Sequence, residues 1–320
     1  NKTFRNWLPL ASFKYNFSRY KSFSLNYTTS TNQPTMSQLQ PVPDVTNPLY
    51  IREGNPDLKQ EFRHTVRGNV TFVSPYKNKN FFMNFSATMS DNKIVNFDSL
   101  DFTNGKRKSK PVNVDGTYNL GGSISYSMPL RFMKASMEVS SRVNYNSDKQ
   151  YFNNLENEIK TLTLGPSFRL DVSPTDKFSF TLGTDFSINN SKYSQQASQD
   201  NKYFSQEYSV SFDWQLPKNF FLSSDFTYTM NTRRAEGFNT NIPIWNASFS
   251  KQFLKYNRGE IKLSVADLLN KNVNISRNAG QSYVEDREVN TLRRFFLLSF
   301  TYSLTKSGLT KEAHGTFMVR

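Results

Sequence analysis

The side chains that most often carry out catalysis or bind metal ions are scarce in this chain. Cysteine is absent, which excludes a disulfide scaffold, a thiolate metal site and a cysteine nucleophile. The two histidines, His64 and His314, lie far apart in the sequence and lack the spacing of metal ligands. Nucleophilic catalysis needs a base beside the nucleophile, and His64 is the one histidine within the patterned part of the chain. We therefore predict no enzyme activity, no catalytic residue, no metal site and no cofactor.

Three further segments have residue types that could bind small ions or nucleic acid. Asp98 and Asp101 could contact calcium, but their spacing lacks a full set of oxygen ligands, so we interpret them as a solvated loop. The glycine-rich segment 116–122 is not a phosphate loop, because no lysine–serine pair or helix pattern follows it. The net charge of +14 invites a nucleic-acid interpretation. However, the basic residues are scattered among acids, and the densest cluster, Lys106–Lys110, stands in an apparent loop, so we predict no nucleic-acid partner.

The stretch Tyr208–Met230 indicates which elements position the remaining polar residues. It reads YSVSFDWQL, then PKN, then FFLSSDFTYTM, and in both halves apolar residues take every second position. Successive side chains of a strand point to opposite faces, so each half has one apolar and one polar face. The segment PKN suits a tight turn, since proline cannot continue a strand ladder. The pattern predicts a long β-hairpin with one apolar face.

The same alternation recurs along the chain and predicts about thirteen strands in all. Short turns alternate with long polar connections, which are residues 31–55, 91–115, 146–158, 189–202, 231–242 and 271–290. Aromatic residues make up 15% of the chain although the mean hydropathy is −0.64, as expected when each strand is half apolar. The pattern is typical of an all-β, antiparallel transmembrane β-barrel with short periplasmic turns and long external loops. The sequence contains no run of about 18 apolar residues, so we predict no membrane-spanning helix.

The strand count suggests that this barrel is incomplete. Bacterial single-chain barrels close with an even number of strands, and an odd number here leaves two open edges. We therefore interpret residues 1–304 as the C-terminal portion of a larger barrel, and residues 305–320 as a periplasmic C-terminal tail. If the whole barrel had 22 strands, these would be the last thirteen.

The polar face of the strands is expected to line the lumen and to contact a ligand or a plug. The candidate residues that share this face are Arg63, Arg67, Arg142, Arg169, Asp213 and Asp225. The alternative is a ladder of paired charges that satisfies the wall. The phase of His64 points it toward lipid, and the aromatic residues near strand ends suit interfacial girdles: Tyr126, Tyr145, Trp214, Trp245 and Tyr302.

Three segments resemble known outer-membrane proteins. The sequence NPLYIREGNPDLKQE, Asn47–Glu61, resembles the GNP-x-L-x-x-E segment of TonB-dependent receptors, and PTMSQLQPVPD resembles the proline-rich approach to it. The segments Ala266–Asn278 and Leu292–Leu304 resemble the final hairpin of the outer-membrane β-barrel family common in Bacteroidetes. A terminal aromatic residue often ends such barrels, whereas sixteen residues follow Leu304 here.

The resemblance implies an active importer in the bacterial outer membrane for a siderophore, an oligosaccharide or a peptide. Its expected partners are outer-membrane lipid, its own N-terminal plug domain (upstream of Asn1), the TonB–ExbB–ExbD complex acting through the plug, and a surface lipoprotein as a candidate cap. The competing interpretation from the residues is a passive outer-membrane porin or an adhesin-like barrel. A soluble carbohydrate-binding β-sandwich is the third class.

Overall fold

The computed structural model describes residues 4–101, 103–195, 200–232, 241–279, 284–289 and 292–304. The predicted tail, residues 305–320, lies outside the described residues, as do parts of the connections 189–202, 231–242 and 271–290. Among the described residues, no helix is long and apolar enough to span a membrane.

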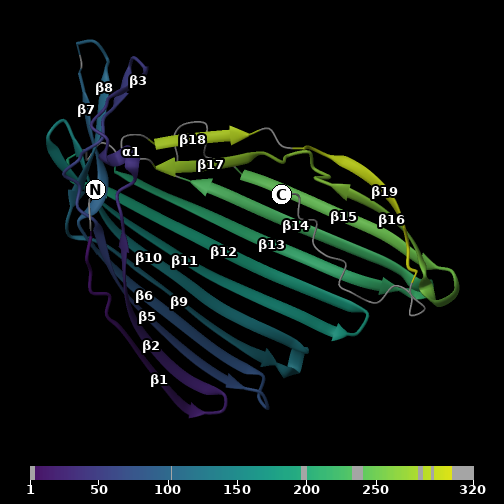
Figure 1. The fold of residues 1–320 in the computed structure, drawn as a ribbon. Helices are drawn as coiled ribbons and strands as arrows, with labels where there is room; N and C mark the ends of the chain where they lie inside the picture. The colour runs from purple at the N-terminus through teal and green to yellow at the C-terminus, as the bar shows by residue number, and fades with distance from the viewer. Residues whose placement is uncertain are drawn as a thin grey trace.

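One curved sheet makes up the wall of the molecule (Figure 1). The described residues form a sheet of seventeen strands, of which four belong to long connections and thirteen form the wall. The wall strands are β1 (Leu10–Ser18), β2 (Lys21–Asn32), β5 (Glu61–Ser74), β6 (Lys79–Asp91), β9 (Thr117–Leu130), β10 (Ala135–Phe152), β11 (Leu155–Thr175), β12 (Phe178–Tyr193), β13 (Asn201–Leu216), β14 (Phe220–Thr232), β15 (Asn241–Phe253), β16 (Gly259–Ala266) and β19 (Phe295–Tyr302). Each pairs antiparallel with the next wall strand. The predicted strand count is confirmed.

The register keeps the apolar and polar residues on separate faces. In the hairpin of β13 and β14, Val210 lies opposite Phe226, and Ser211 lies opposite Asp225. The turn is a short 3-10 segment, η3 (Pro217–Asn219), in which Lys218 and Asn219 take left-handed backbone angles. Because a slip of one residue would move every side chain to the other face, the alternation fixes this register.

Two kinds of connection join the wall strands, and each kind lies at its own end of the sheet. Six tight turns follow β1, β5, β9, β11, β13 and β15, and they form the short-turn end. The long connections lie at the opposite end, which we call the long-connection end (Figure 1). They contain α1 (Met36–Leu39), β3 (Asp44–Asn47), β4 (Tyr50–Arg52), β7 (Lys93–Leu100), β8 (Arg107–Val114), β17 (Asn274–Ala279) and β18 (Val284–Val289).

The prediction of a polar loop at residues 146–158 is wrong. Strand β10 continues to Phe152 and β11 begins at Leu155, so Asn153 and Asn154 alone make the turn. Both asparagines have positive φ, 47° and 66°, which asparagine tolerates better than most residues. The extension has no apolar face, and pairs such as Lys149–Glu156, at 2.9 Å, stabilise it.

The connection 91–115 is also more ordered than the sequence indicated. It folds into the antiparallel hairpin of β7 and β8, and β8 pairs in parallel with β4. Apolar and polar residues do not alternate regularly in β7 (KIVNFDSL) or β8 (RKSKPVNV), so this hairpin lacks the pattern that reveals the wall strands.

The apolar face of the wall is largely exposed. Phe296, Leu298 and Phe300 of β19 are 66%, 70% and 62% exposed, and only seven hydrophobic side chains of the described residues are buried. A water-soluble sandwich would bury this face against a second sheet. The described wall is a single layer, so the β-sandwich alternative is wrong.

The described wall does not close on itself. Strand β1 pairs with β2 and β19 pairs with β16, and no pairing joins β1 to β19 in the described part of the chain. The two strands lie at opposite edges of the sheet in Figure 1. The interpretation of residues 1–304 as the C-terminal portion of a larger barrel stays a prediction.

Candidate functional site: the polar wall and the loop body

The six predicted site residues share the polar face of the wall, but they do not form one cluster. Cross-strand pairs connect this face from β2 to β14, for example Arg67 with Ser86 and Ser211 with Asp225. Arg63 lies at the long-connection end, 3.8 Å from Glu61. Asp213 lies toward the short-turn end and accepts a 2.6 Å hydrogen bond from Ser223. A ligand passing along this face would meet these residues one after another.

Hydrogen bonds between neutral groups link many neighbouring strands on the polar face, and hydroxyls also donate across strands to Asp171 and Asp213. The neutral cross-strand hydrogen bonds join Ser12 to Asn26, Asn84 to Ser123, Ser140 to Ser167, Thr161 to Ser191, and Ser205 to Asn231. One ion pair of the described residues lies on this face away from the long connections, between Arg169 and Asp171 of the same strand at 3.0 Å. The face is therefore not the ladder of paired charges that was the alternative expectation.

Arg142 stands over a groove in this polar face. The groove has a volume of about 660 Å³ and is lined by small and amide residues together with Asp185 and Glu207. Arg142 is exposed and has no ion-pair partner in the part of the chain that the structure describes. A second hollow of about 210 Å³ adjoins it, with Glu138 and Arg169 in its lining and Asp185 common to both. The groove therefore offers a ligand the guanidinium of Arg142 and the carboxyl groups of Asp185 and Glu207.

A folded body rises from the long-connection end. This loop body comprises residues 33–60, 92–101 and 103–116, with α1, β3, β4, β7 and β8. The backbone of Glu53 donates to Ser109 at 3.0 Å, and that of Arg107 donates to Leu49 at 2.8 Å, so two connections far apart in sequence join in one unit. The tip of the β10–β11 hairpin docks on it through Asn153, whose backbone donates to Asp98.

The segment GNPDLKQE is the anchor of the loop body. The backbones of Gly54 and Gln40 meet so closely that a Cβ on Gly54 would lie 2.3 Å from the Gln40 carbonyl oxygen. Asn55 donates its side-chain amide to the Pro111 carbonyl at 3.0 Å, and Leu58 is completely buried. Glycine and asparagine therefore stand where close backbone approach and a bridging amide are needed.

The last residue of this segment connects the body to the wall. Glu61 is 6% exposed and begins β5. Its carboxylate accepts hydrogen bonds from the backbone of Ile94 at 2.8 Å and from the side chain of Asn32 at 3.0 Å. One buried carboxylate thus joins β2, β5 and the start of β7.

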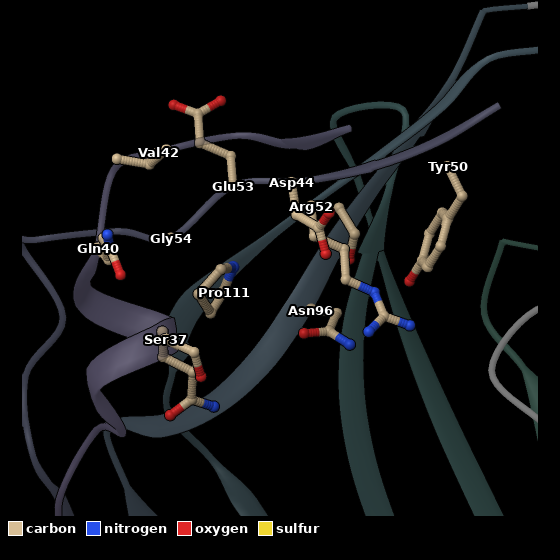
Figure 2. Close-up of a pocket in the computed structure, with 12 residues that line it drawn as sticks. Ser37, Gln40, Val42, Asp44, Tyr50, Arg52, Glu53, Gly54, Asn96 and Pro111 are labelled. Atoms are coloured by element: carbon tan, nitrogen blue, oxygen red, sulfur yellow. The ribbon is translucent and has the colours of Figure 1, made fainter. Parts of the chain in front are cut away.

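The loop body encloses a polar pocket of about 530 Å³ (Figure 2). Tyr50, Arg52 and Asn96 group on one side, and Ser37 and Gln40 lie on the other. The Arg52 and Arg107 guanidinium carbons lie 4.8 and 5.3 Å from the Tyr50 ring centre. Hydroxyls, amides, one aromatic ring and both signs of charge equip the pocket to hold a polar ligand by hydrogen bonds.

Fixed charges surround the pocket. A hydrogen bond from Lys108 lowers the pKa of Glu53, and hydrogen bonds from the Thr46 side chain and backbone lower the pKa of Asp44. The hydrogen bond to Asp98 raises the pKa of Arg107. These shifts of pKa favour the charged forms of Asp44, Glu53 and Arg107.

Two of the sequence interpretations change here. Asp98 is not in a solvated loop: it is 5% exposed and pairs with Arg107 at 2.7 Å. The cluster Lys106–Lys110 is not a loop either, because most of it forms β8, where Lys108 pairs with Glu53 at 2.5 Å. Among the described residues, no group of three or more histidine and acidic side chains could hold a metal ion.

The pocket itself was missed from the sequence. Tyr50 and Arg52 stand in the segment that resembles TonB-dependent receptors, which was a signal for their neighbourhood. Asn96 and Ser109 come from the hairpin that lacked any strand pattern, and no local feature connects them to Tyr50.

Comparison with known proteins decides the family. The sequence profile of the outer membrane protein beta-barrel family matches residues 1–164 and 130–302. The chain belongs to this family. No curated protein matches the chain. As a member of the outer membrane protein beta-barrel family it resides in the bacterial outer membrane, and membership suggests a transport or porin-like role. The exposed apolar face of the wall suits contact with lipid.

Proposed function

We propose that this chain is the barrel wall of a TonB-dependent receptor, which imports a scarce nutrient with energy from the proton-motive force. The observation that carries the proposal is the structural use of the segment GNPDLKQE. Its residues hold the loop body, with its polar pocket, at the long-connection end of the wall. The short-turn end then faces the periplasm and the loop body faces outside.

The arrangement supports capture followed by passage. The pocket with Tyr50 and Arg52 lies at one end of the wall, and the groove on the polar face offers a ligand neutral amides and hydroxyls together with Arg142, Asp185 and Glu207. Buried fixed contacts at Glu61 keep the pocket in place relative to the wall. A passive pore needs no such anchored pocket at its entrance.

The open edges support an incomplete barrel. Unpaired backbone groups cost several kcal/mol each in hydrocarbon, so open edges are not tolerated there. About nine further strands upstream would complete a barrel of 22 strands, a width that needs a plug. We therefore place the plug and its TonB box in the polypeptide ahead of Asn1, and we expect residues 1–320 expressed alone to aggregate in detergent.

The uptake experiment uses the complete gene product and a panel of labelled ferric siderophores, oligosaccharides and peptides. We expect one of these to accumulate in cells that express the protein, and accumulation to stop when an uncoupler collapses the proton-motive force or when TonB is deleted. Accumulation that continues under both conditions would favour the alternative, a passive porin. If residues 1–320 alone formed a stable, heat-modifiable monomer, this would contradict the proposal that the barrel is incomplete.

A further inference from the structure

The six tight turns at the short-turn end share a basic character. Every one of them contains lysine or arginine, and the basic residues are Arg19, Lys77, Arg131, Lys134, Lys177, Lys218, Lys255 and Arg258. The same turns contain a single acid, Asp176. Eight positive charges therefore stand against one negative charge along this rim.

Three more lysines lie just above the turns on the apolar face. Lys21, Lys79 and Lys251 are exposed. By the alternation of the strands, they lie on the same face of the sheet as the neighbouring aromatic residues. Lys21 lies opposite Phe72 in the register, and the ammonium of Lys251 lies 4.8 Å from the ring centre of Phe220. A lysine at the edge of an apolar face can lie along that face while its charged group reaches the lipid headgroups.

Exposed aromatic residues stand beside the basic ones in the turns. Tyr76 is 92% exposed, Phe132 is 83% exposed and Tyr256 is 63% exposed. The guanidinium of Arg19 lies 5.8 Å from the Tyr20 ring, and the ammonium of Lys255 lies 5.2 Å from the Tyr256 ring. Aromatic side chains of this kind favour the boundary between hydrocarbon and headgroups.

These charges have no acidic partner inside the described protein. None of its ion pairs includes any of the eleven basic residues named above. Two of the turn residues donate hydrogen bonds to backbone carbonyl oxygens: Lys134 to that of Pro174 and Arg258 to that of Ser303. The others present their charge outward, so the rim attracts an anion from outside the chain.

We propose that the short-turn end binds the headgroups of anionic phospholipids in the membrane leaflet that it faces. The rim is continuous with the lipid-facing side of the wall, and its lysines and aromatic residues occur at intervals along the sheet rather than in one patch. That distribution fits many small anions at one depth in a bilayer. A single acidic protein would contact only part of it.

The proposal does not depend on energised import, since a passive barrel with this rim would hold the same lipids. Its test uses the complete protein released from detergent in a native mass spectrometer, with phosphatidylglycerol and phosphatidylcholine as probes. We expect several-fold more phosphatidylglycerol than phosphatidylcholine to remain bound, and we expect the difference to shrink as the salt concentration rises. Equal retention of the two lipids by the unaltered protein would overturn the proposal.

A matched pair of variants locates the binding. The triple variant Lys21→Gln, Lys79→Gln and Lys251→Gln removes three of the eleven basic residues and should reduce the phosphatidylglycerol preference while it stays heat-modifiable. The control removes three charges from the loop body instead, by Lys59→Gln, Lys106→Gln and Lys110→Gln, and should keep the preference. Equal losses in both would mean a general charge effect and would contradict a site at the rim. A third outcome would also contradict the proposal. If the triple variant lost an acidic protein that co-purifies with the unaltered protein, while its lipid retention stayed unchanged, the rim would bind a protein partner instead.

Discussion

The two ends of the sheet treat their charges in opposite ways. At the long-connection end, lysines and arginines pair with acids of the same chain: Arg63 with Glu61, Lys93 with Asp148, Arg107 with Asp98, Lys108 with Glu53, Lys149 with Glu156, and Lys160 with Glu158. The remaining described ion pair, Arg169 with Asp171, lies on the polar face toward the short-turn end. None of the described ion pairs includes a residue of the six tight turns.

The difference shows what each end has to do. Beyond the membrane, the loop body has few apolar side chains to bury, and paired charges with shared backbone hydrogen bonds hold it together. The short turns are already fixed by the strands on either side, so their charges are not needed for folding. Charges that a fold does not use internally remain available for another molecule.

The largest expected effect concerns the core of the loop body. Leu58→Ala leaves a cavity at a fully buried position and should destabilise the body by about 2–5 kcal/mol. Hydrogen exchange of the β4 and β8 amides should speed up accordingly, while exchange in the short-turn halves of the wall strands stays unchanged. Leu49→Ala, at a residue that is 59% exposed, is the control and should change little. Uniform acceleration throughout the wall would mean that the two ends are not separate units.

The wall between the two ends should respond according to face. Val210→Arg places a charge on the apolar face in mid-strand and should cost about 2–4 kcal/mol in a barrel. Ser211→Arg, one residue on, should be far milder because it lies on the polar face opposite Asp225. Heat modifiability of the folded barrel measures both. Comparable losses would show that the faces are assigned wrongly.

A paired charge should matter more than an unpaired one. Asp98→Asn removes the partner of Arg107 at a nearly buried position and should weaken the loop body by about 1–3 kcal/mol. Lys218→Gln, in an exposed turn at the other end, should change the free energy of unfolding by less than about 0.5 kcal/mol. Hydrogen-exchange rates and thermal melting of the two variants measure this difference in stability. Similar losses in both variants would contradict the prediction.

The smallest effect is a pH dependence at the long-connection end. The pKa of Glu53 in the folded state lies below its ordinary value of 4.5 because Lys108 donates a hydrogen bond to it. A depressed acid stabilises the fold above the unfolded pKa, and this contribution is lost as the pH falls through the folded value. Exchange at β4 should therefore accelerate on acidification below the ordinary value. In Glu53→Gln that part of the pH dependence should disappear; an unaltered profile would show that Glu53 does not contribute to it.

The wall could be predicted from the sequence because the membrane imposes a simple pattern on it. Alternation in Tyr208–Met230 sets strands, turn and faces together, and the structure follows it residue by residue. The extended hairpin at Asn153–Asn154 could not be predicted, because strands in water have no lipid to face and show no apolar period. The burial of Asp98 depends on Arg107 across a hairpin whose strands were not recognised.

The central claim is that the two ends of the sheet face opposite sides of the outer membrane. Cysteine labelling tests this claim most directly. The sequence contains no cysteine, so a single cysteine can be introduced at Lys106, in the loop body, or at Thr175, beside a short turn; both positions are exposed. With a membrane-impermeant maleimide on intact cells expressing the complete protein, we expect Lys106→Cys to be labelled and Thr175→Cys to be protected until the cells are lysed. Labelling of Thr175→Cys on intact cells, equal to or stronger than that of Lys106→Cys, would contradict the account.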